Sequence, residues 1–427
     1  MLVLFFSVLP LLLYSSPCLF LILSFLFIYY STLVSSYFNF DFFTEFLYLD
    51  SFSYFLVYLT FLVLFFSYFY ALPFNPSKLV SLSVVVLLVC CFYVFSTSNL
   101  FLLYLSYEAS LVPIIYIIIK WGSYPERSLA SFMLLAYTAV LSFPFIYVLF
   151  YIFSFCGTLF FYSSSFTLSF FMTLLAFLTF SVKLPIYGLH FWLPMAHVEA
   201  PTFGSMILAG VLLKLGGAGL FRMSSYMDMF ALKTTLFSYF LVYLVYSTLV
   251  CCIQSDFKRI VAYSSVSHMM CLPLSYVVCS HLSDKAFYLI MFFHGVSSPL
   301  LFSIVGTIYS YYGTRQLVAL RGLLVVSPLF SLILVFAFLY TMSTPPFPSF
   351  IGEVFFFISS YYVTFYSVFF LFFFAFLSMV YNINWLSSIV FSSYSSSSTF
   401  SVNYFTFYTT FFPVVLSLPM LVYISYM

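Results

Sequence analysis

The sequence predicts an all-α polytopic membrane protein with about 13–14 transmembrane helices, and three observations support this fold class. Its 427 residues are 65% hydrophobic and only 5% charged, whereas soluble domains carry about 25% charged residues. Apolar runs of about 20 residues, the length that crosses a bilayer, recur from one end of the chain to the other. These runs are continuous instead of alternating, which excludes a membrane barrel, because barrel strands alternate between lipid and lumen.

Short polar stretches between the apolar runs divide the chain into expected helices, which group into larger parts. Helices are expected at residues 51–73, 79–97, 99–119, 129–153, 166–197, 203–222, 234–254, 259–280, 286–309, 322–359, 361–384 and 405–425, with one or two more in residues 2–40. We expect one membrane domain over residues 1–427. Its parts are N-terminal helices (1–73), a first repeat (79–222), a second repeat (234–384) and a C-terminal helix (405–427).

Two of these segments are too long for one straight crossing and contain prolines near their middles. Segment 166–197 contains Pro185 and Pro194, and segment 322–359 contains Pro345, Pro346 and Pro348. Proline removes a backbone donor and clashes with the preceding turn, so both segments should be broken helices. Broken helices at corresponding positions of two halves are typical of inverted-repeat transporters, whose sites lie near the bilayer midplane.

Basic residues in alternate loops predict which side of the membrane each loop faces. The first set of loops holds Lys78, Lys120, Arg127, Lys258, Arg259, Arg315 and Arg321, and the second holds Arg222, Lys233 and Lys285. Under the positive-inside rule, the first set faces the cytoplasm or its organellar equivalent. The abundance of Phe and Tyr, which have T-rich codons, is consistent with a strand-biased organellar genome.

The sequence lacks the patterns of metal, nucleotide and nucleic-acid sites. Its eight cysteines have no metal-ligand spacing, and the pairs Cys90-Cys91 and Cys251-Cys252 lie inside apolar runs as small buried hydrophobes. It contains no glycine-rich nucleotide loop and no cluster of Lys and Arg. We therefore expect no cofactor, no metal and no nucleic-acid partner for this chain.

Two lysines lie where a membrane protein normally avoids charge. Lys183 follows an apolar run and precedes Pro185, and a charge near the bilayer centre costs several kcal/mol unless it faces a bundle interior or an ion route. The alternative is an interfacial lysine at a shallower depth. Lys214 lies near the centre of helix 203–222, where a nearby carboxylate that moves can make an amine take up or release a proton. The neighbouring glycines also favour close helix packing, which is a competing reason for this motif.

Two glutamates are the candidate acidic partners. Glu108 lies in the middle of helix 99–119, and that helix and segment 166–197 could bring it to Lys183. Glu353 follows the prolines of the second broken segment, as a counterpart of Lys183 in the other half. Glu199, beside Pro201, is expected to be a structural partner.

Four histidines are candidates for proton transfer. His190 and His197 follow Lys183 by seven and fourteen residues, a spacing that would align them on one face of a continuous helix. His268 and His294 lie on neighbouring helices and could bridge the two halves. Because a membrane histidine serves packing as readily as proton transfer, both interpretations stay open. His281, in a loop, is expected to be a solvated surface residue.

Five stretches within residues 100–360 closely resemble one family. They are YEASLVPIIYIIIKWGSYPER, VKLPIYGLHFWLPMAHVEAPTFGSMILAGVLLKLGGAGLFR, SDFKRIVAYSSVSHM, HGVSSPLLF and TPPFPSFIGE, in that order. The chain is thereby similar to the antiporter-like membrane subunits of respiratory complex I. AHVEAP followed by GSM favours the chain 4 type of mitochondrial NADH:ubiquinone oxidoreductase over chains 2 and 5, and the pattern at Arg315 and Arg321 agrees.

The resemblance implies two inverted five-helix repeats with broken helices and a proton path along a polar midplane axis. It implies that Glu108 and Lys183 form a coupled ion pair, that Lys214 is the central relay lysine and that Glu353 is the exit-side carboxylate. The resemblance further implies a relay or water-organising role for His190, His197, His268 and His294. It also implies partners, namely other membrane subunits of complex I with their sister antiporter-like chains, lipids, protons and internal water, in the mitochondrial inner membrane.

Three functions therefore compete. The first is a proton-translocating subunit of complex I that couples to NADH-to-ubiquinone electron transfer elsewhere in the complex, with no redox centre in this chain. The second is a free-standing Na⁺/H⁺ antiporter subunit of the same superfamily, or a sister chain of complex I. The third is a structural membrane spacer, and the buried charges argue against it.

Overall fold

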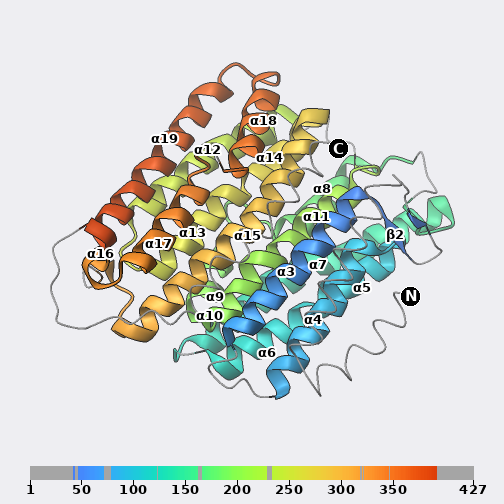
Figure 1. Cartoon of the computed structure of the whole chain (residues 1–427). Helices are drawn as coiled ribbons and strands as arrows, with labels where there is room; N and C mark the ends of the chain where they lie inside the picture. Colours follow the sequence, from blue (N-terminus) through green and yellow to red (C-terminus); the bar gives the residue numbers. More distant parts are fainter. Residues whose placement is uncertain are drawn as a thin grey trace. The chain divides into compact units, whose positions relative to one another are not determined.

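The computed structural model describes residues 42–43, 47–71, 78–122, 124–161, 166–227, 233–317, 320, 322–345 and 347–391. Within these ranges the chain is almost entirely helical (Figure 1), apart from a short antiparallel pair formed by β1 (Phe42–Phe43) and β2 (Tyr48–Leu49). The helices expected in residues 2–40 and 405–425 lie outside the described residues.

The apolar helices agree with the predicted fold class. In the described part of the chain, nine helices are long and apolar enough to cross a membrane, and three shorter apolar helices adjoin the proline-containing breaks. The prediction of an all-α polytopic membrane protein is confirmed. The inverted symmetry of the repeats and their boundaries stay predictions.

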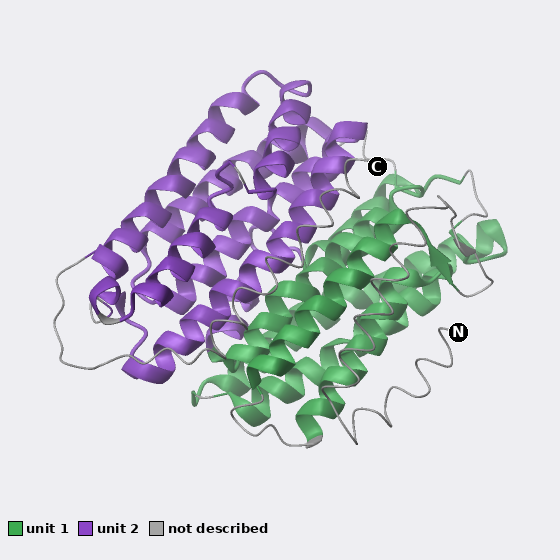
Figure 2. Ribbon diagram, in the orientation of Figure 1, with its two compact units in different colours: residues 1–183, 199–228, 427 green, residues 184–198, 229–426 purple. Residues whose placement is uncertain are grey.

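The chain forms two compact units, coloured separately in Figure 2. Unit 1 comprises residues 1–183, 199–228 and 427, and unit 2 comprises residues 184–198 and 229–426. Segment 184–198 thus belongs to unit 2, although the sequence analysis assigned it to the first repeat. Contacts within unit 2, described below, account for this difference.

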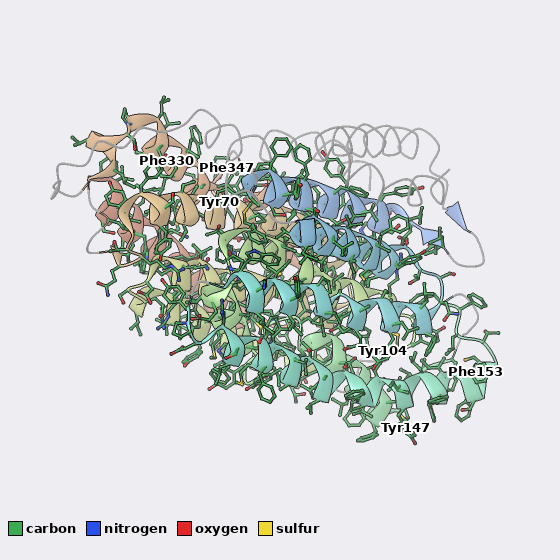
Figure 3. All side chains as sticks on the ribbon, turned by 90° about the horizontal axis from the view of Figure 1, so that it is seen from below. Tyr70, Tyr104, Tyr147, Phe153, Phe330 and Phe347 are labelled. Atoms are coloured by element: carbon green, nitrogen blue, oxygen red, sulfur yellow. The ribbon has the colours of Figure 1, made fainter. Side chains whose placement is uncertain are left out.

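Unit 1 is a bundle of apolar helices. Its elements after the β pair are α3 (Ser51–Ala71), α4 (Lys78–Ser96), α5 (Leu100–Ala109), α6 (Leu111–Trp121), α7 (Arg127–Cys156), α8 (Phe170–Ser181), α10 (Thr202–Ile207), the π-helical segment η2 (Leu208–Leu212) and α11 (Leu213–Met223). Helix α4 packs against α3, α5, α6 and α11, while α8 packs between α7 and α11. The large apolar side chains of α7 are mostly exposed, and Figure 3 shows Tyr147 and Phe153 projecting outward from it. Such an apolar outer face is suited to lipid.

Unit 2 is built around one long helix. Its elements are α9 (Trp192–Glu199, whose last residue is assigned to unit 1), α12 (Lys233–Ile253), α13 (Phe257–Met269), α14 (Cys271–Val278), α15 (His281–Tyr312), α16 (Leu323–Val326), α17 (Pro328–Thr341), α18 (Ser349–Tyr361), α19 (Ser367–Leu386) and the π-helical η5 (Ser387–Phe391). The apolar span of α15 is fully buried, and α13, α14, α17 and α18 pack against it. Gly352 permits the close approach of α18, because an added Cβ would lie 3.0 Å from the Leu289 side chain.

Prolines break the two long segments where the sequence predicted. Turns at residues 182–191 separate α8 from α9, and they contain Pro185. Pro194 lies in the first turn of α9, where a proline nitrogen needs no intrahelical acceptor, so it does not add a second break. In the second segment, α17 ends at Thr341 and α18 begins at Ser349.

Two further helices are interrupted where the sequence analysis expected continuous ones. Ser110 separates α5 from α6, three residues before Pro113, and Met270 separates α13 from α14, three residues before Pro273. In both cases the missing proline N–H leaves the carbonyl one turn earlier without its amide donor, which weakens the helix at that point.

Candidate functional site

Lys183 is fully buried at the end of α8, in unit 1. Its Nζ donates to the Tyr107 carbonyl at 2.8 Å and lies 3.5 Å from the Ser110 hydroxyl. The same nitrogen lies 3.2 Å from the centroid of the Tyr107 ring, where the negative face of an aromatic ring attracts a cation. The interruption between α5 and α6 therefore supplies the polar surroundings that an ammonium requires in an apolar bundle.

The expected ion pair between Glu108 and Lys183 is not a direct contact. Both residues lie in the described part of the chain, and no N···O distance within 4.0 Å joins their two side chains. Lys183 bonds instead to the carbonyl of the preceding residue, Tyr107, while Oε1 of Glu108 is buried without a hydrogen-bond partner in the described part of the chain. The acceptor for the Lys183 ammonium is therefore a backbone carbonyl, and Glu108 is the residue that follows it in the chain.

Lys214 is fully buried directly after the π-helical segment η2. A π-turn contains one residue more than an α-turn, so it alters the amide-to-carbonyl pairing of the helix, and such turns are frequent at functional sites. The Lys214 ammonium donates to the carbonyl of Ala209, within η2, at 2.6 Å. The helix that contains this lysine thus also provides a polar partner for its charge.

Glu353 lies in unit 2, where it contacts two side chains from other parts of the sequence. Its Oε1 accepts a hydrogen bond from the Ser343 hydroxyl at 2.6 Å and lies 3.4 Å from Nδ1 of His268. A cavity of about 30 Å³ adjoins these groups, and its polar lining consists of His268, His294, Ser297, Tyr340, Thr341, Ser343, Ser349 and Glu353. A water molecule needs roughly 10–15 Å³ of such space, so the cavity has room for about two.

His268 of α13 and His294 of α15 lie near each other, and both belong to unit 2. Their ring centroids are 6.2 Å apart, which leaves no direct hydrogen bond but permits a bridging water. Nε2 of His268 is buried without a hydrogen-bond partner among the described residues. The His294 carbonyl accepts from the Ser298 hydroxyl at 2.7 Å.

His190 and His197 do not line that cavity. Both lie in segment 184–198, which belongs to unit 2. His190 stacks on Tyr187, with ring centroids 6.0 Å apart, and lies 5.4 Å from the Tyr243 ring of α12. His197 is fully buried and stacks on Phe302 of α15 at 4.9 Å. Lys183, His190 and His197 would share one face only in a continuous helix, and the turns after α8 end the helical periodicity between them.

Two basic residues that the loop count included, Lys258 and Arg315, form hydrogen bonds to the end of α9. Lys258 and Arg315 both donate to the Val198 carbonyl, at 2.9 and 3.3 Å. Lys258 is only 1% exposed. Cations near a helix C-terminus are favourable, because the last carbonyls lack intrahelical donors. These bonds explain why segment 184–198 packs as part of unit 2.

The buried Arg222 forms an ion pair with the half-buried Asp50, a contact that the sequence pattern does not predict. It lies 3.1 Å from Asp50 and also donates to the carbonyl of Phe95 at 3.0 Å. Asp50 in turn accepts from the backbone N–H of Ser53 at the start of α3. The helix ends of α3, α4 and α11 are thereby joined within unit 1.

The arrangement suits proton transfer better than ligand binding. In unit 2, the Glu353 carboxyl group contacts the Ser343 hydroxyl and the His268 imidazole beside a small cavity, and all three groups can donate or accept protons. In the part of the chain that the structure describes, no group of three His, Cys, Asp or Glu residues gathers as a metal site.

Known proteins share both the sequence pattern and the fold. The family model described as NADH:quinone oxidoreductase/Mrp antiporter, TM matches residues 97–413. NADH-ubiquinone oxidoreductase chain 4 of Ceratitis capitata is 38% identical over 287 residues, covering 66% of this chain and 64% of the relative. The chain 4 protein of Artemia franciscana is 35% identical over 341 residues, covering 77% of this chain and 86% of the relative.

Solved structures agree in fold. A chain of respiratory complex I from Thermus thermophilus with bound NADH superposes with a TM-score of 0.85 at 21% identity, covering 98% of this chain and 94% of that one. A chain of the Mrp complex from Dietzia superposes with a TM-score of 0.76 at 16% identity, covering 93% and 76%. The sequence match over residues 97–413 and the chain 4 relatives show that this chain belongs to the NADH:quinone oxidoreductase/Mrp antiporter transmembrane family, in its chain 4 branch.

Proposed function

We propose that this chain is a proton-translocating, antiporter-like membrane subunit of respiratory complex I. It couples NADH-to-ubiquinone electron transfer, which takes place in other subunits, to proton movement across the mitochondrial inner membrane. It contributes to the enzyme as a subunit without a redox centre of its own. Its partners are the other membrane subunits, including sister antiporter-like chains, together with lipids and internal water.

The observation that carries the proposal is the burial of two lysines of this chain, Lys183 in the turn after α8 and Lys214 in α11, together with its membership of the chain 4 branch. Lys183 and Lys214 are both 0% exposed, and each bonds to a backbone carbonyl beside an interrupted or π-helical segment. A structural spacer would have no reason to retain such charges, because each costs several kcal/mol in a membrane. We assign the relay to Glu108, Lys183, Lys214 and Glu353, with His190, His197, His268 and His294 as supporting groups.

The proposed orientation places the more basic loops on the matrix side. Two of the ten residues behind this count, Arg222 and Lys258, are buried with carbonyl partners, so the exposed residues Lys120 and Arg259 carry more of the argument. Labelling a cysteine introduced at Lys120 in sealed inner-membrane vesicles tests the orientation. Reaction only from the intermembrane side would reverse it.

Co-migration of the chain with NADH dehydrogenase activity on a native gel tests its membership of complex I. A free-standing Na⁺/H⁺ antiporter, the second candidate, would migrate apart from that activity; the fold shared with an Mrp chain supports this alternative as superfamily context only. Proton uptake by vesicles oxidising NADH then tests translocation. Sodium-dependent proton movement without NADH would favour the antiporter.

A further inference from the structure

Ser343 has a backbone conformation that serine rarely adopts. Its φ is +51°, and among the non-glycine residues of the described chain only Cys279 shares a positive value. A non-glycine residue in this region costs about 1–3 kcal/mol and persists where the surroundings enforce it, often at functional sites. Ser343 lies between α17 and α18, where the prolines have broken the helix.

The strained backbone directs the Ser343 hydroxyl at Glu353. The hydroxyl donates to Oε1 at 2.6 Å, and the same oxygen lies 3.4 Å from Nδ1 of His268. Ser343 is 7% exposed and lines the polar cavity. One carboxylate oxygen therefore faces two proton-bearing groups beside space for water.

Ser343 has the same spacing to a proline in its broken segment that Lys183 has in the first, whereas Glu353, the expected acidic counterpart of Lys183, follows the prolines. Ser343 and Lys183 each lie two residues before a proline, Pro345 in one case and Pro185 in the other. Each also forms a hydrogen bond beside an interrupted helix. Lys183 donates to the carbonyl of Tyr107, the residue before Glu108. Ser343 donates to the carboxylate of Glu353, which contacts His268.

The interrupted helices match in the same way. Glu108 lies five residues before Pro113, and His268 lies five residues before Pro273. At this spacing from the proline, unit 2 has a neutral hydroxyl and unit 1 has an ammonium. An ammonium can only donate hydrogen bonds, whereas a hydroxyl can donate and accept.

We propose that Ser343 is a positioning residue for proton transfer at Glu353, and that its hydroxyl reverses its hydrogen-bond direction when the proton arrives. While Glu353 is a carboxylate, the Ser343 O–H donates to Oε1. When Oε1 takes a proton from the imidazolium of His268, which becomes neutral imidazole, or from a hydronium ion in the cavity, which becomes water, the new carboxyl O–H donates to Ser343 Oγ, and the serine proton turns toward the cavity. When Glu353 then passes its proton to a water molecule in the cavity, which becomes hydronium, the Ser343 O–H turns back to donate to Oε1, and the Ser343 O–H bond is never broken.

This inference rests on the proposed function, and variants in the assembled complex test it. Ser343→Ala removes the hydroxyl and keeps the backbone strain, whereas Ser343→Gly removes the hydroxyl and relieves the strain. We expect both to lower the rate of proton translocation coupled to NADH oxidation by about two- to tenfold, the factor that one hydrogen bond represents. The control Ser359→Ala, which removes a buried hydroxyl of α18 that donates to the Phe356 carbonyl, should translocate normally.

Infrared difference spectra give a measurement that should not change if Ser343 has only a structural role. The Glu353 carboxyl band, identified by its loss in Glu353→Gln, should shift in both Ser343 variants and stay unchanged in Ser359→Ala. In a Glu353→Gln background, Ser343→Ala should cause no further loss of translocation. Normal translocation by Ser343→Gly, or an unshifted band, would overturn the positioning role and leave strain as the only function of the residue.

Two outcomes separate this inference from the proposed function. If Glu353→Gln itself translocates protons normally, the relay assignment of Glu353 fails and this inference fails with it. If Glu353→Gln is impaired while both Ser343 variants are normal, only this inference fails. Loss of assembly in Ser343→Gly as well as in Ser343→Ala would assign the hydroxyl a structural role and would also overturn the proposal.

Discussion

The ammonium of Lys183 donates to the backbone carbonyl of Tyr107, 2.8 Å away, and forms no direct contact with the carboxylate of Glu108, the next residue. A neutral acceptor holds the lysine, so the carboxylate can change its protonation without releasing it. The two charges should still influence each other, because in an apolar bundle Coulomb interactions extend beyond contact distance.

A double-mutant cycle measures that interaction. Glu108→Gln leaves Lys183 without a nearby opposite charge, and Lys183→Met leaves Glu108 in the same state, so each single change should destabilise the complex. The double variant should cost less than the sum, with a coupling of about 0.5–1 kcal/mol, near the low end for interacting residues. Thermal unfolding and complex content give the values. Strict additivity would separate the two residues, and a coupling above about 3 kcal/mol would indicate a direct ion pair.

Lys214→Ala should suppress proton translocation while the complex still assembles. The change removes a buried proton carrier, and loss of a positioned proton-transfer group typically costs about 100-fold or more in rate. Lys214→Arg should not restore the rate, because a guanidinium stays protonated. Vesicle acidification and quinone reduction are the measurements, and Lys120→Ala, at an exposed lysine in the last turn of α6, is the matched control. Full translocation by an assembled Lys214→Ala complex would rule out the relay role.

Arg222→Ala should act on stability instead of translocation. The change leaves Asp50 partly buried without its cation, which typically costs about 3–5 kcal/mol, and it removes a bond to the Phe95 carbonyl. The exposed pair of Arg259 with Asp256 serves as a control, since Arg259→Ala should cost about 0–1 kcal/mol. Complex content and melting temperature measure both. Equal effects of the two variants would contradict the structural role of Arg222.

Gly219→Ala should disturb unit 1 next to Lys183. An added Cβ would overlap the ring of Phe180 on α8, and overpacking of this kind typically costs about 1–3 kcal/mol. Phe180 packs edge-on against the Tyr107 ring at 5.5 Å, so the overlap should also slow proton translocation. The second change Phe180→Leu should restore part of the melting temperature by making room. No recovery in the double variant would show that the strain lies elsewhere.

Proline positions made the helix breaks predictable, because the effect of proline on its own helix is local. The turns around Pro185 and the break before Ser349 fall inside the segments predicted to break. The same rule does not single out the interruptions before Pro113 and Pro273, because Pro144 in α7 and Pro299 in α15 lie inside helices that continue past them. The apolar runs around Pro113 and Pro273 are each long enough to indicate one continuous crossing.

The contacts of the charged residues are harder to predict from the sequence than the helix breaks. Burial of Lys183 and Lys214 follows from their apolar neighbours, but their acceptors are backbone carbonyls, which leave no trace in residue identity. The π-turn before Lys214 depends on packing around it. The contact of His268 with Glu353 joins α13 to α18, and sequence spacing alone cannot relate side chains on two separate helices.

The assignment of residues 184–198 to unit 2 limits how the gene could be divided. If translation were split after α11, the N-terminal product would carry the Val198 carbonyl that Lys258 and Arg315 require, and the C-terminal product would carry those two cations. Separate products could reach the native arrangement only by complementation, with the first supplying its segment to the second. A chimera that joined halves of two distant relatives would have to take segment 184–198 from the same parent as α13 and α15. The part of the sequence that must stay together therefore does not end where the first helix bundle ends.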